Sequence, residues 1–507
     1  MKKNIKLLIS IMIAGLSFAI GYFVNFFLTR FITDNVGTDA QGYVTLCKTF
    51  ATYVVVATTA LNSYAARFIT LEYHKGNIEK AKIYYNSVFG ANLVVGGLFF
   101  LLSIILTPFI GSILSVPSSL KNDVTILFVL VFFNLFISLI STAFQAATYI
   151  KDKVYLSSIF RCVSYVMEAV SLLCLYNLFS PKVLYTGIGL IVATLVTSYG
   201  YFFITKKFTP DLTIDLKKID LKSIKELVVA GVWNSVNGLG NTLNSGLDML
   251  VSNAVLSAVA MGQVSIVKSI VNIFSGLYQM VAQPFQPRFL HSYAEKDNNR
   301  LLHDLKLSMR ISGLISNLAF SGVVAFGLSY FKLWLPNQDT NLLYRLTVIA
   351  VATSVLEGAM YPLYYIYTLT IKNKIPCIIT IIGGLANVLG MVLLIKYTSL
   401  GIYAVFITTA IIMNVINGIT NPIYMSKCLG LSFSTFYPSI LRHVISCLVM
   451  TVVIKKIGDI INPSSWIELI FGAIIATILG GFIHVLIAFN FTEIKSYVGK
   501  AVRMLKK

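Results

Sequence analysis

The sequence predicts an all-α integral membrane protein with about fourteen transmembrane helices, arranged as twelve plus two. Three observations predict this class. Of the 507 residues, 57% are hydrophobic and only 12% are charged, whereas soluble proteins average about 25% charged residues. Apolar runs near the roughly 20 residues that a membrane helix needs recur along the whole chain. Lysine and arginine concentrate in alternate loops. A soluble globular protein is therefore excluded.

Each apolar run is bounded by short polar or basic stretches, which set the ends of the expected helices. The first run follows Lys2, Lys3 and Lys6 as a signal peptide would, but its apolar stretch is too long and lacks a small-x-small cleavage site. We therefore expect it to remain as the first helix. The expected helices cover residues 7–29, 43–66, 83–107, 123–149, 154–178, 184–204, 227–251, 262–286, 307–332, 342–370, 375–396, 401–424, 438–454 and 466–490.

The charges give the orientation. With the N-terminus inside, 28 of the 40 basic residues fall in inner segments and seven in outer ones, which places both termini in the cytoplasm. Acidic residues number eleven inside and six outside, so the net charge is +17 inside, +1 outside and +2 within the bilayer. Most of the +20 therefore only orients the chain, and we expect no nucleic-acid partner.

The sequence lacks the motifs of several kinds of site, including disulfides, metal sites and ATP-binding loops. The six cysteines are not placed to form an outer-face disulfide. The five histidines have no metal-ligand spacing, and no G-x-x-x-x-G-K-[ST] loop occurs. The outer loops are short, which leaves little room for the extracytoplasmic domain of a membrane glycan polymerase or ligase. We expect no metal, no cofactor and no enzymatic activity.

An internal repeat divides the chain. The segment from Gly42 to Lys48 matches that from Gly262 to Lys268 with glycine and lysine in register. The spacing of about 220 residues equals six expected spans, and an even number makes the copies parallel. We expect an N-lobe of helices 1–6 (1–205), a basic cytoplasmic linker (206–226), a C-lobe of helices 7–12 (227–425), and two additional helices with a basic tail (426–507), with a central cavity between the lobes.

Polar residues follow one face of several expected helices. In helix 227–251 they recur every three or four residues, which places one polar group on the same face at each turn. Such a face avoids lipid. Each contact could instead be an interhelical hydrogen bond, but recurrence in five helices favours a water-filled cavity. The cavity candidates on these stripes and on neighbouring helices are Asn25, Asn241, Asn244, Asn272, Gln279, Arg161 and Tyr361.

Ionisable residues within spans are functional candidates. Lys48 and Lys268 occupy equivalent repeat positions and are expected to face each other across the cavity. Arg30, Arg67 and Arg288 are expected at its ends. Glu168, Asp248 and Glu357 are candidates for binding a coupling ion. Arg161 and Glu168 are about 10 Å apart along one helix axis, which is too far for a direct salt bridge.

With this architecture, the chain resembles the polysaccharide flippases of the Wzx type, within the multidrug, oligosaccharidyl-lipid and polysaccharide exporter superfamily. Three local similarities accompany the likeness of architecture. They are Gly231-Val232-Trp233-Asn234, Pro284-Phe285-Gln286-Pro287-Arg288-Phe289 with the inner loop after it, and Leu333-Trp334-Leu335-Pro336.

The resemblance implies export of an undecaprenyl-diphosphate-linked oligosaccharide across the bacterial cytoplasmic membrane by alternating access. Lys48 and Lys268 would then lower the cost of moving the diphosphate. H⁺ and Na⁺ both stay open as coupling ion, as does a complex with a polysaccharide polymerase. The alternatives are a lipid II flippase, a cation-coupled multidrug exporter of the same superfamily, and, less favoured, a membrane glycan polymerase or ligase.

Overall fold

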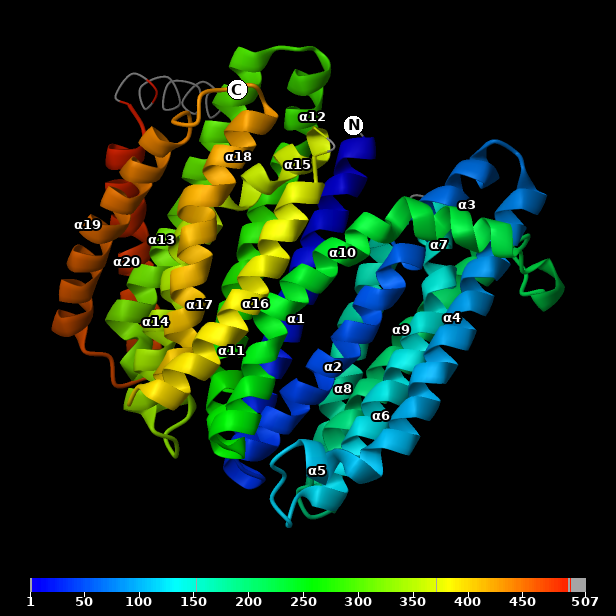
Figure 1. Cartoon of the computed structure of the whole chain (residues 1–507), viewed down its shortest axis with the longest axis horizontal. Coiled ribbons are helices and arrows are strands. Elements are labelled where there is room, and N and C mark those ends of the chain that lie inside the picture. Colours follow the sequence, from blue (N-terminus) through cyan, green and yellow to red (C-terminus); the bar gives the residue numbers. More distant parts are fainter. Residues whose placement is uncertain (1, 152, 371, 491–492, 494–507) are drawn as a thin grey trace. The chain divides into compact units, whose positions relative to one another are not determined.

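A computed structural model describes residues 2–151, 153–370, 372–490 and 493, and the all-α expectation is confirmed, because no strand occurs in these ranges. Within them, the side chains of 2–14, 18, 112–113, 154, 237, 241, 243–245, 287 and 294 are outside the described part. Contacts between Cα atoms divide the chain into two compact units, Met1–Ser265 and Ile266–Lys507. Each unit is a helical bundle in itself (Figure 1).

The first unit holds ten α-helices, four short helical turns and the start of an eleventh helix. In chain order they are α1 (Lys2–Asn35), α2 (Thr38–Asn62), α3 (Ala65–His74), α4 (Ile78–Leu106), η1 (Thr107–Phe109), α5 (Ile110–Ile113), α6 (Lys121–Ser141), η2 (Thr142–Gln145), α7 (Ala146–Ile150), α8 (Val154–Leu178), α9 (Tyr185–Phe208), η3 (Leu216–Lys218), α10 (Leu221–Val251), η4 (Ser252–Leu256) and α11 (Ala258–Ala282), of which the first eight residues belong here.

The second unit contains the rest of α11 and nine further α-helices. They are, with their connecting turns, η5 (Gln283–Phe285), α12 (Gln286–Ala294), α13 (Asn298–Trp334), α14 (Thr340–Met360), η6 (Tyr361–Tyr364), α15 (Tyr365–Leu369), α16 (Lys374–Tyr397), α17 (Tyr403–Val415), η7 (Ile416–Thr420), α18 (Asn421–Cys428), α19 (Tyr437–Ile461) and α20 (Trp466–Ala488). The basic tail after residue 493 lies outside the described residues.

The fourteen expected spans fall on helical segments, and some of them, such as 123–149 and 342–370, are interrupted by a short turn. Among the described residues, twelve helices are long and apolar enough to cross a membrane. The helices α10 and α19, which cover the expected spans 227–251 and 438–454, are not among these twelve. The chain is thus a multi-pass membrane protein, and the count of fourteen spans stays a prediction.

Helix ends follow local chemistry. Asp297 accepts from the backbone N–H of Arg300 at 2.9 Å, which caps α13. At α20, Ser465 accepts from the N–H of Glu468 at 3.3 Å while the Glu468 carboxylate accepts from the N–H of Ser464 at 2.8 Å, a variant of the capping box. Proline begins several of the breaks, as in η5 and η6, because it cannot donate within a helix.

The internal repeat recurs in backbone hydrogen bonds. The loops after α3 and after α12 make the same bonds at positions 220 residues apart, and in each a residue with positive φ makes the turn, Gly76 at 79° and Lys296 at 57°. The same spacing recurs at the start of α2 and of α11. The paired N–H to O bonds are Gly76 to Tyr73 (3.2 Å) with Lys296 to Tyr293 (3.1 Å), Asn77 to Glu72 (2.9 Å) with Asp297 to Ser292 (3.0 Å), and Gly37 to Ile32 with Ser257 to Ser252 (both 3.0 Å).

In the first unit, α2 and α8 pack extensively against neighbouring helices, and a buried cluster lies at the end of the bundle that contains α3 and α7. The helix α10 begins beside α4 and continues along α2 (Figure 1). A buried cluster joins α3, α4, α9 and α10, and it includes Ile69, Tyr85, Phe144, Leu212 and Leu227. The division between the compact units falls within α11. The lobe boundaries drawn from the sequence stay a prediction.

In the second unit, α13 packs against α14, α19 and α20, so the last two helices belong to the same bundle. Two buried histidines fasten them. His443 Nε2 lies 2.8 Å from the Val355 carbonyl oxygen, and His484 Nε2 lies 2.9 Å from that of Arg310. The partner in each bond is a carbonyl, so each Nε2 donates. These histidines are packing residues that tie α19 and α20 to α14 and α13.

Candidate functional site

The predicted site residues fall into two groups, one in each compact unit. In the first unit, Lys48 on α2 is partly exposed, and Glu168 on α8 is only 8% exposed. The charge of Lys48 acts on the Glu168 carboxyl. The sequence did not indicate this electrostatic interaction, because the two residues are 120 positions apart in separate helices. A buried carboxyl within the field of an accessible ammonium is a site that a cation or an anion can perturb.

The helix α1 packs against α8 in the same part of the first unit. Gly21 lets α1 approach α8, because a Cβ at residue 21 would lie 2.8 Å from the Tyr165 ring. Asn25 is exposed and donates to the Gly21 carbonyl at 2.8 Å. Arg161 is also exposed and acts electrostatically on Tyr165. The structure therefore brings Arg161, Tyr165 and Glu168 along one helix, with Arg161 accessible and Glu168 covered.

A second buried carboxyl lies between α10 and α2. Asp248 is 4% exposed, and its charge acts on the Tyr53 hydroxyl. The helices come close at Gly246, where a Cβ would lie 2.9 Å from Tyr53 Oη. The other amides of the predicted α10 stripe cannot be placed in the same way. The side chains of Asn241 and Asn244 lie outside the described residues.

The starts of α2 and α11 meet at equivalent positions of the repeat. A Cβ at Gly42 would lie 2.8 Å from the Gly262 nitrogen, and a Cβ at Gly262 would lie 2.0 Å from the Thr38 carbonyl oxygen. One turn further on, Thr45 Oγ1 and Ser265 Oγ are 2.5 Å apart. Both glycines are required by this close approach. The glycine pair that first revealed the repeat is thus a contact point.

In the second unit, α11 carries the other predicted lysine. Lys268 is partly exposed, and Asn272 and Gln279 are exposed. Lys268 and Asn272 are one turn apart, so they share a helix face. Their predicted role in binding substrate stays a prediction.

The third carboxyl, Glu357 on α14, lies among tyrosines. It is partly buried, one turn before Tyr361, and its charge acts on Tyr361 and Tyr364. Tyr364 donates to Asn417 Oδ1 at 2.6 Å. Asn417 lies in the π-helical turn η7, a type of irregularity that is frequent at functional sites. Sequence reasoning found Glu357 and Tyr361 on one stripe but not their link to α17–α18.

A polar ladder continues from Asn417 to the end of α15. Asn421 Nδ2 donates to Asn417 Oδ1 at 2.9 Å, and Tyr367 Oη donates to Asn421 Oδ1 at 2.9 Å. The asparagine spacing in residues 414–421 was the available signal, since it places amides on one helix face.

The three predicted end arginines differ in their surroundings. Arg30, near the end of α1, lies 3.6 Å from Asp34. Arg67 and Arg288 are exposed, and each guanidinium carbon lies 5.8 Å from the ring centre of the aromatic residue three positions earlier, Tyr64 or Phe285. These two arginines have the same local geometry in the two repeats, which supports their alignment with a shift of one residue.

The chain is similar to known membrane proteins in sequence and in fold. The chain is 28% identical over 457 residues to the uncharacterized membrane protein EpsK of Bacillus subtilis (strain 168), covering 90% of each chain. Among solved structures, lipid II flippase MurJ in an inward closed conformation matches with a TM-score of 0.71 and 14% identity, over 94% of this chain and 99% of the other.

An inward-facing multidrug resistance MATE family transporter of the MOP superfamily matches with a TM-score of 0.67 and 13% identity, over 84% of this chain and 99% of the other. At such identities the likeness shows the fold alone, and that fold is the one expected from the resemblance to this superfamily. The family model described as "Polysaccharide biosynthesis protein" matches residues 3–292, more than half of the chain. The chain therefore belongs to the family of polysaccharide biosynthesis proteins and has the fold of the MATE and MurJ transporters.

Proposed function

We propose that this protein is a flippase that exports undecaprenyl-diphosphate-linked oligosaccharide repeat units across the bacterial cytoplasmic membrane by alternating access. Family membership and a transporter fold support the coarse function. The observation that carries the substrate class is a lysine at the same repeat position in two hydrophilic helix faces, Lys48 and Lys268. A diphosphate is an anion, and a charge-assisted contact within the membrane lowers the cost of its passage.

In this proposal the cavity between the lobes offers amides, hydroxyls and tyrosines to the sugar hydroxyls. Asn25, Asn272, Gln279 and Tyr361 are the members whose side chains are described, and Asn241 and Asn244 are proposed with them. The polyprenyl tail stays in lipid. Arg30, Arg67 and Arg288 receive or release the diphosphate at the cavity ends, and Arg161 lies along its path.

Ion coupling would use the membrane carboxyls. Glu168 beside Lys48 and Glu357 among tyrosines are the sites where binding of H⁺ or Na⁺ would change the local charge, and Asp248 is the third candidate. Glutamine at Glu168 or Glu357, or asparagine at Asp248, should uncouple export from the ion gradient. The measurement is glycan export in vesicles with an imposed proton or sodium gradient. Export that keeps its full gradient dependence in all three variants would count against coupling at these groups.

The decisive test of the substrate class uses Lys268. Lys268→Gln should reduce complementation of an export-deficient strain by about tenfold or more, the factor expected for a lost charge-assisted contact of 1.5–3 kcal/mol, while Lys268→Arg retains more activity. Lys182→Gln, which removes an exposed lysine of an expected outer loop, is the matched control. Membrane levels are compared by immunoblot. Unchanged export by Lys268→Gln would remove the proposed role.

The likeness to MurJ supports lipid II as a second candidate substrate. Both substrates present a diphosphate, so lysine variants cannot separate them. Analysis of the lipid-linked sugar that accumulates in the inner leaflet after deletion separates the two, since a repeat-unit flippase should leave lipid II unchanged. If the protein is a multidrug exporter, the third candidate, the deletion strain should lose drug resistance and accumulate no lipid-linked sugar. A polymerase partner for the exported glycan belongs to the first proposal alone.

A further inference from the structure

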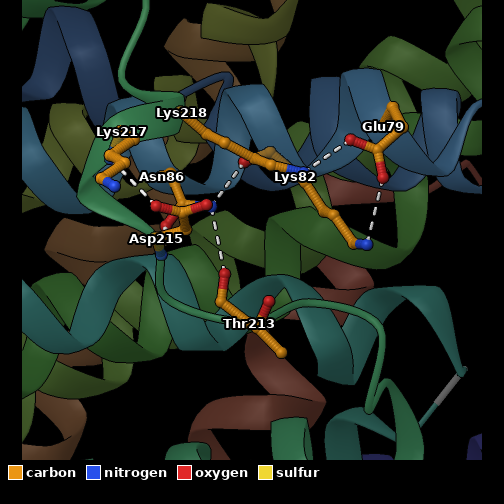
Figure 2. A network of polar contacts seen from close by, with 7 residues as sticks. All are labelled: Glu79, Lys82, Asn86, Thr213, Asp215, Lys217 and Lys218. Carbon is orange, nitrogen blue, oxygen red and sulfur yellow. Dashed lines mark hydrogen bonds and ion pairs between the residues drawn. The ribbon is translucent and has the colours of Figure 1, made fainter.

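The segment that joins α9 to α10 is attached along α4 instead of forming a flexible linker. We call residues 209–222, which include the first two residues of α10, the strap. Two buried residues of α4, Asn86 and Ser87, bind its backbone, and Figure 2 shows the contacts of Asn86. Asn86 Nδ2 donates to the Thr213 carbonyl at 3.1 Å, and Asn86 Oδ1 accepts from the Asp215 N–H at 2.7 Å. Ser87 Oγ accepts from the Asp220 N–H at 2.9 Å. Because Asn86 and Ser87 are fully buried, these bonds hold the strap in one register.

Side chains fasten the strap at further points. Lys218 Nζ lies 2.6 Å from Glu79, whose other carboxylate oxygen lies 3.2 Å from Lys82 (Figure 2). Leu212 is buried in the cluster that joins α3, α4, α9 and α10. Ile219 packs on Gly90, where a Cβ would lie 2.4 Å from Ile219 Cδ1. The strap is thus attached by its backbone, by an ion pair and by apolar contacts.

This attachment leaves other apolar side chains uncovered. Ile214 is 45% exposed, Leu216 is 55% exposed and Leu221, the first residue of α10, is 80% exposed. Lys217 and Lys222, which follow the two leucines directly, are also exposed. Asn86 and Ser87 bind the backbone on both sides of Leu216, and Leu221 directly follows the residue that Ser87 binds.

Residues 209–222 hold three lysines and three aspartates. The aspartates accept hydrogen bonds within the protein, Asp211 from Tyr73 Oη, Asp215 from the N–H of Lys217 and Asp220 from the N–H of Lys222. The exposed leucines next to Lys217 and Lys222 are therefore the groups available to a membrane surface.

The strap starts where a span ends. The helix α9 finishes with Lys206, Lys207 and Phe208, and Lys153 Nζ lies 3.5 Å from the centre of the Phe208 ring. Lysines and aromatic rings together at a helix end are typical of the membrane–water interface. The strap therefore begins at the level of the lipid headgroups, on the face that the positive-inside rule places in the cytoplasm.

We propose that the strap lies on the inner leaflet and binds anionic lipid. Leu216 and Leu221 enter the boundary between headgroups and acyl chains, and Lys217 and Lys222 contact lipid phosphates. The cytoplasmic leaflet attracts basic segments next to a membrane span. The inference is independent of the exported glycan, because it concerns how the first compact unit is fixed to the membrane surface.

The experiment measures the depth of single nitroxide labels in the full chain. Labels are attached at Leu216→Cys and Leu221→Cys in a background with Cys162→Ala and Cys174→Ala, since the other four cysteines are buried. The protein is placed in nanodiscs of phosphatidylcholine with or without phosphatidylglycerol. Collision with oxygen reports on the lipid phase, and collision with a water-soluble nickel chelate reports on the aqueous phase. An Asn299→Cys label is the control, because Asn299 is an exposed residue of another predicted inner loop.

In nanodiscs with phosphatidylglycerol, the labels at 216 and 221 should favour oxygen severalfold over the control label. The double variant Lys217→Gln/Lys222→Gln should lose the part of this shift that depends on phosphatidylglycerol, whereas Lys296→Gln/Arg300→Gln, which removes two cations from the loop of the control label, should keep it. Labels at 216 and 221 that match the Asn299 control would overturn the proposal, and the surface would then be open to an acidic soluble protein. Equal depth with and without phosphatidylglycerol would overturn the assignment of the lysines.

Discussion

The hydroxyl groups of Thr45 on α2 and Ser265 on α11 lie 2.5 Å apart, and the two residues occupy equivalent positions of the repeat. Contact between equivalent residues is expected close to the axis that relates two copies. Just before them in the chain, Gly42 and Gly262 allow the backbones to meet. Under the proposed alternating access, we expect this contact to form in one state and to break in another, since both residues lie at helix ends that the predicted topology places on the outer side.

A cysteine pair tests that requirement. Thr45→Cys/Ser265→Cys should form a disulfide under oxidation, because the hydroxyl distance is compatible with the 3.5–4.5 Å between Cβ atoms that a disulfide needs. Oxidised protein should lose export, and reduction should restore it. Thr52→Cys/Ser265→Cys is the control, since Thr52 is exposed two turns further along α2. Full export by the oxidised pair would show that this contact does not open.

The glycine contact predicts a stability difference. Gly262→Ala would place a Cβ 2.0 Å from the Thr38 carbonyl oxygen, so it should cost about 1–3 kcal/mol, as overpacking does. Gly322→Ala is the matched substitution, because a Cβ at residue 322 meets nothing within 4 Å. The measurement is the thermal unfolding midpoint in detergent. Similar midpoints for the two variants would mean that α11 shifts at no cost.

The pairing of Lys48 with Glu168 predicts coupling between their substitutions. Lys48→Gln removes the positive charge that acts on the buried Glu168 carboxyl. Export by Lys48→Gln/Glu168→Gln should therefore exceed the value predicted by multiplying the two single effects, with a coupling of about 0.5–3 kcal/mol. Lys182→Gln combined with Glu168→Gln should be multiplicative. Multiplicative behaviour of the Lys48 pair as well would show that the two groups act independently.

The two hydrogen bonds of Asn86 to the strap backbone predict that removing them makes the strap less ordered. Asn86→Ala removes both bonds to the strap backbone, so hydrogen–deuterium exchange of residues 213–216 should increase. Asn35→Ala, which removes an exposed amide that bonds only within α1 among the contacts described, is the control. Unchanged exchange in Asn86→Ala would assign the attachment to Glu79 and Leu212 instead. The variant should still insert in the membrane, because the lost bonds lie at one end of the bundle.

Composition and charge were enough to predict the fold class, since lipid admits only helices or closed barrels and the apolar runs had the length of helices. Gly42 and Gly262 gave the repeat because close helix contacts tolerate few residue types. The sequence could not predict that Asn86 binds the strap, because one buried asparagine looks the same whether it contacts a neighbouring helix or a loop more than 120 residues away. Periodicity likewise placed Lys48 and Glu168 on faces of helices but could not indicate that the charge of Lys48 acts on the Glu168 carboxyl.

The boundary between the two compact units lies between Ser265 and Ile266, inside α11, and this affects how α11 can bend. One uninterrupted helix is shared by both compact units, and helix interiors are stiff except at a few residue types. Between Ala258 and Ala282 there is no proline, and glycine occurs only at 262 and 276. While the contact with α2 holds, Gly262 is packed against Thr38, so the neighbourhood of Gly276 is the more flexible part of the helix. A conformational cycle that bends α11 would therefore concentrate its curvature two to three turns beyond the lysine that each repeat carries.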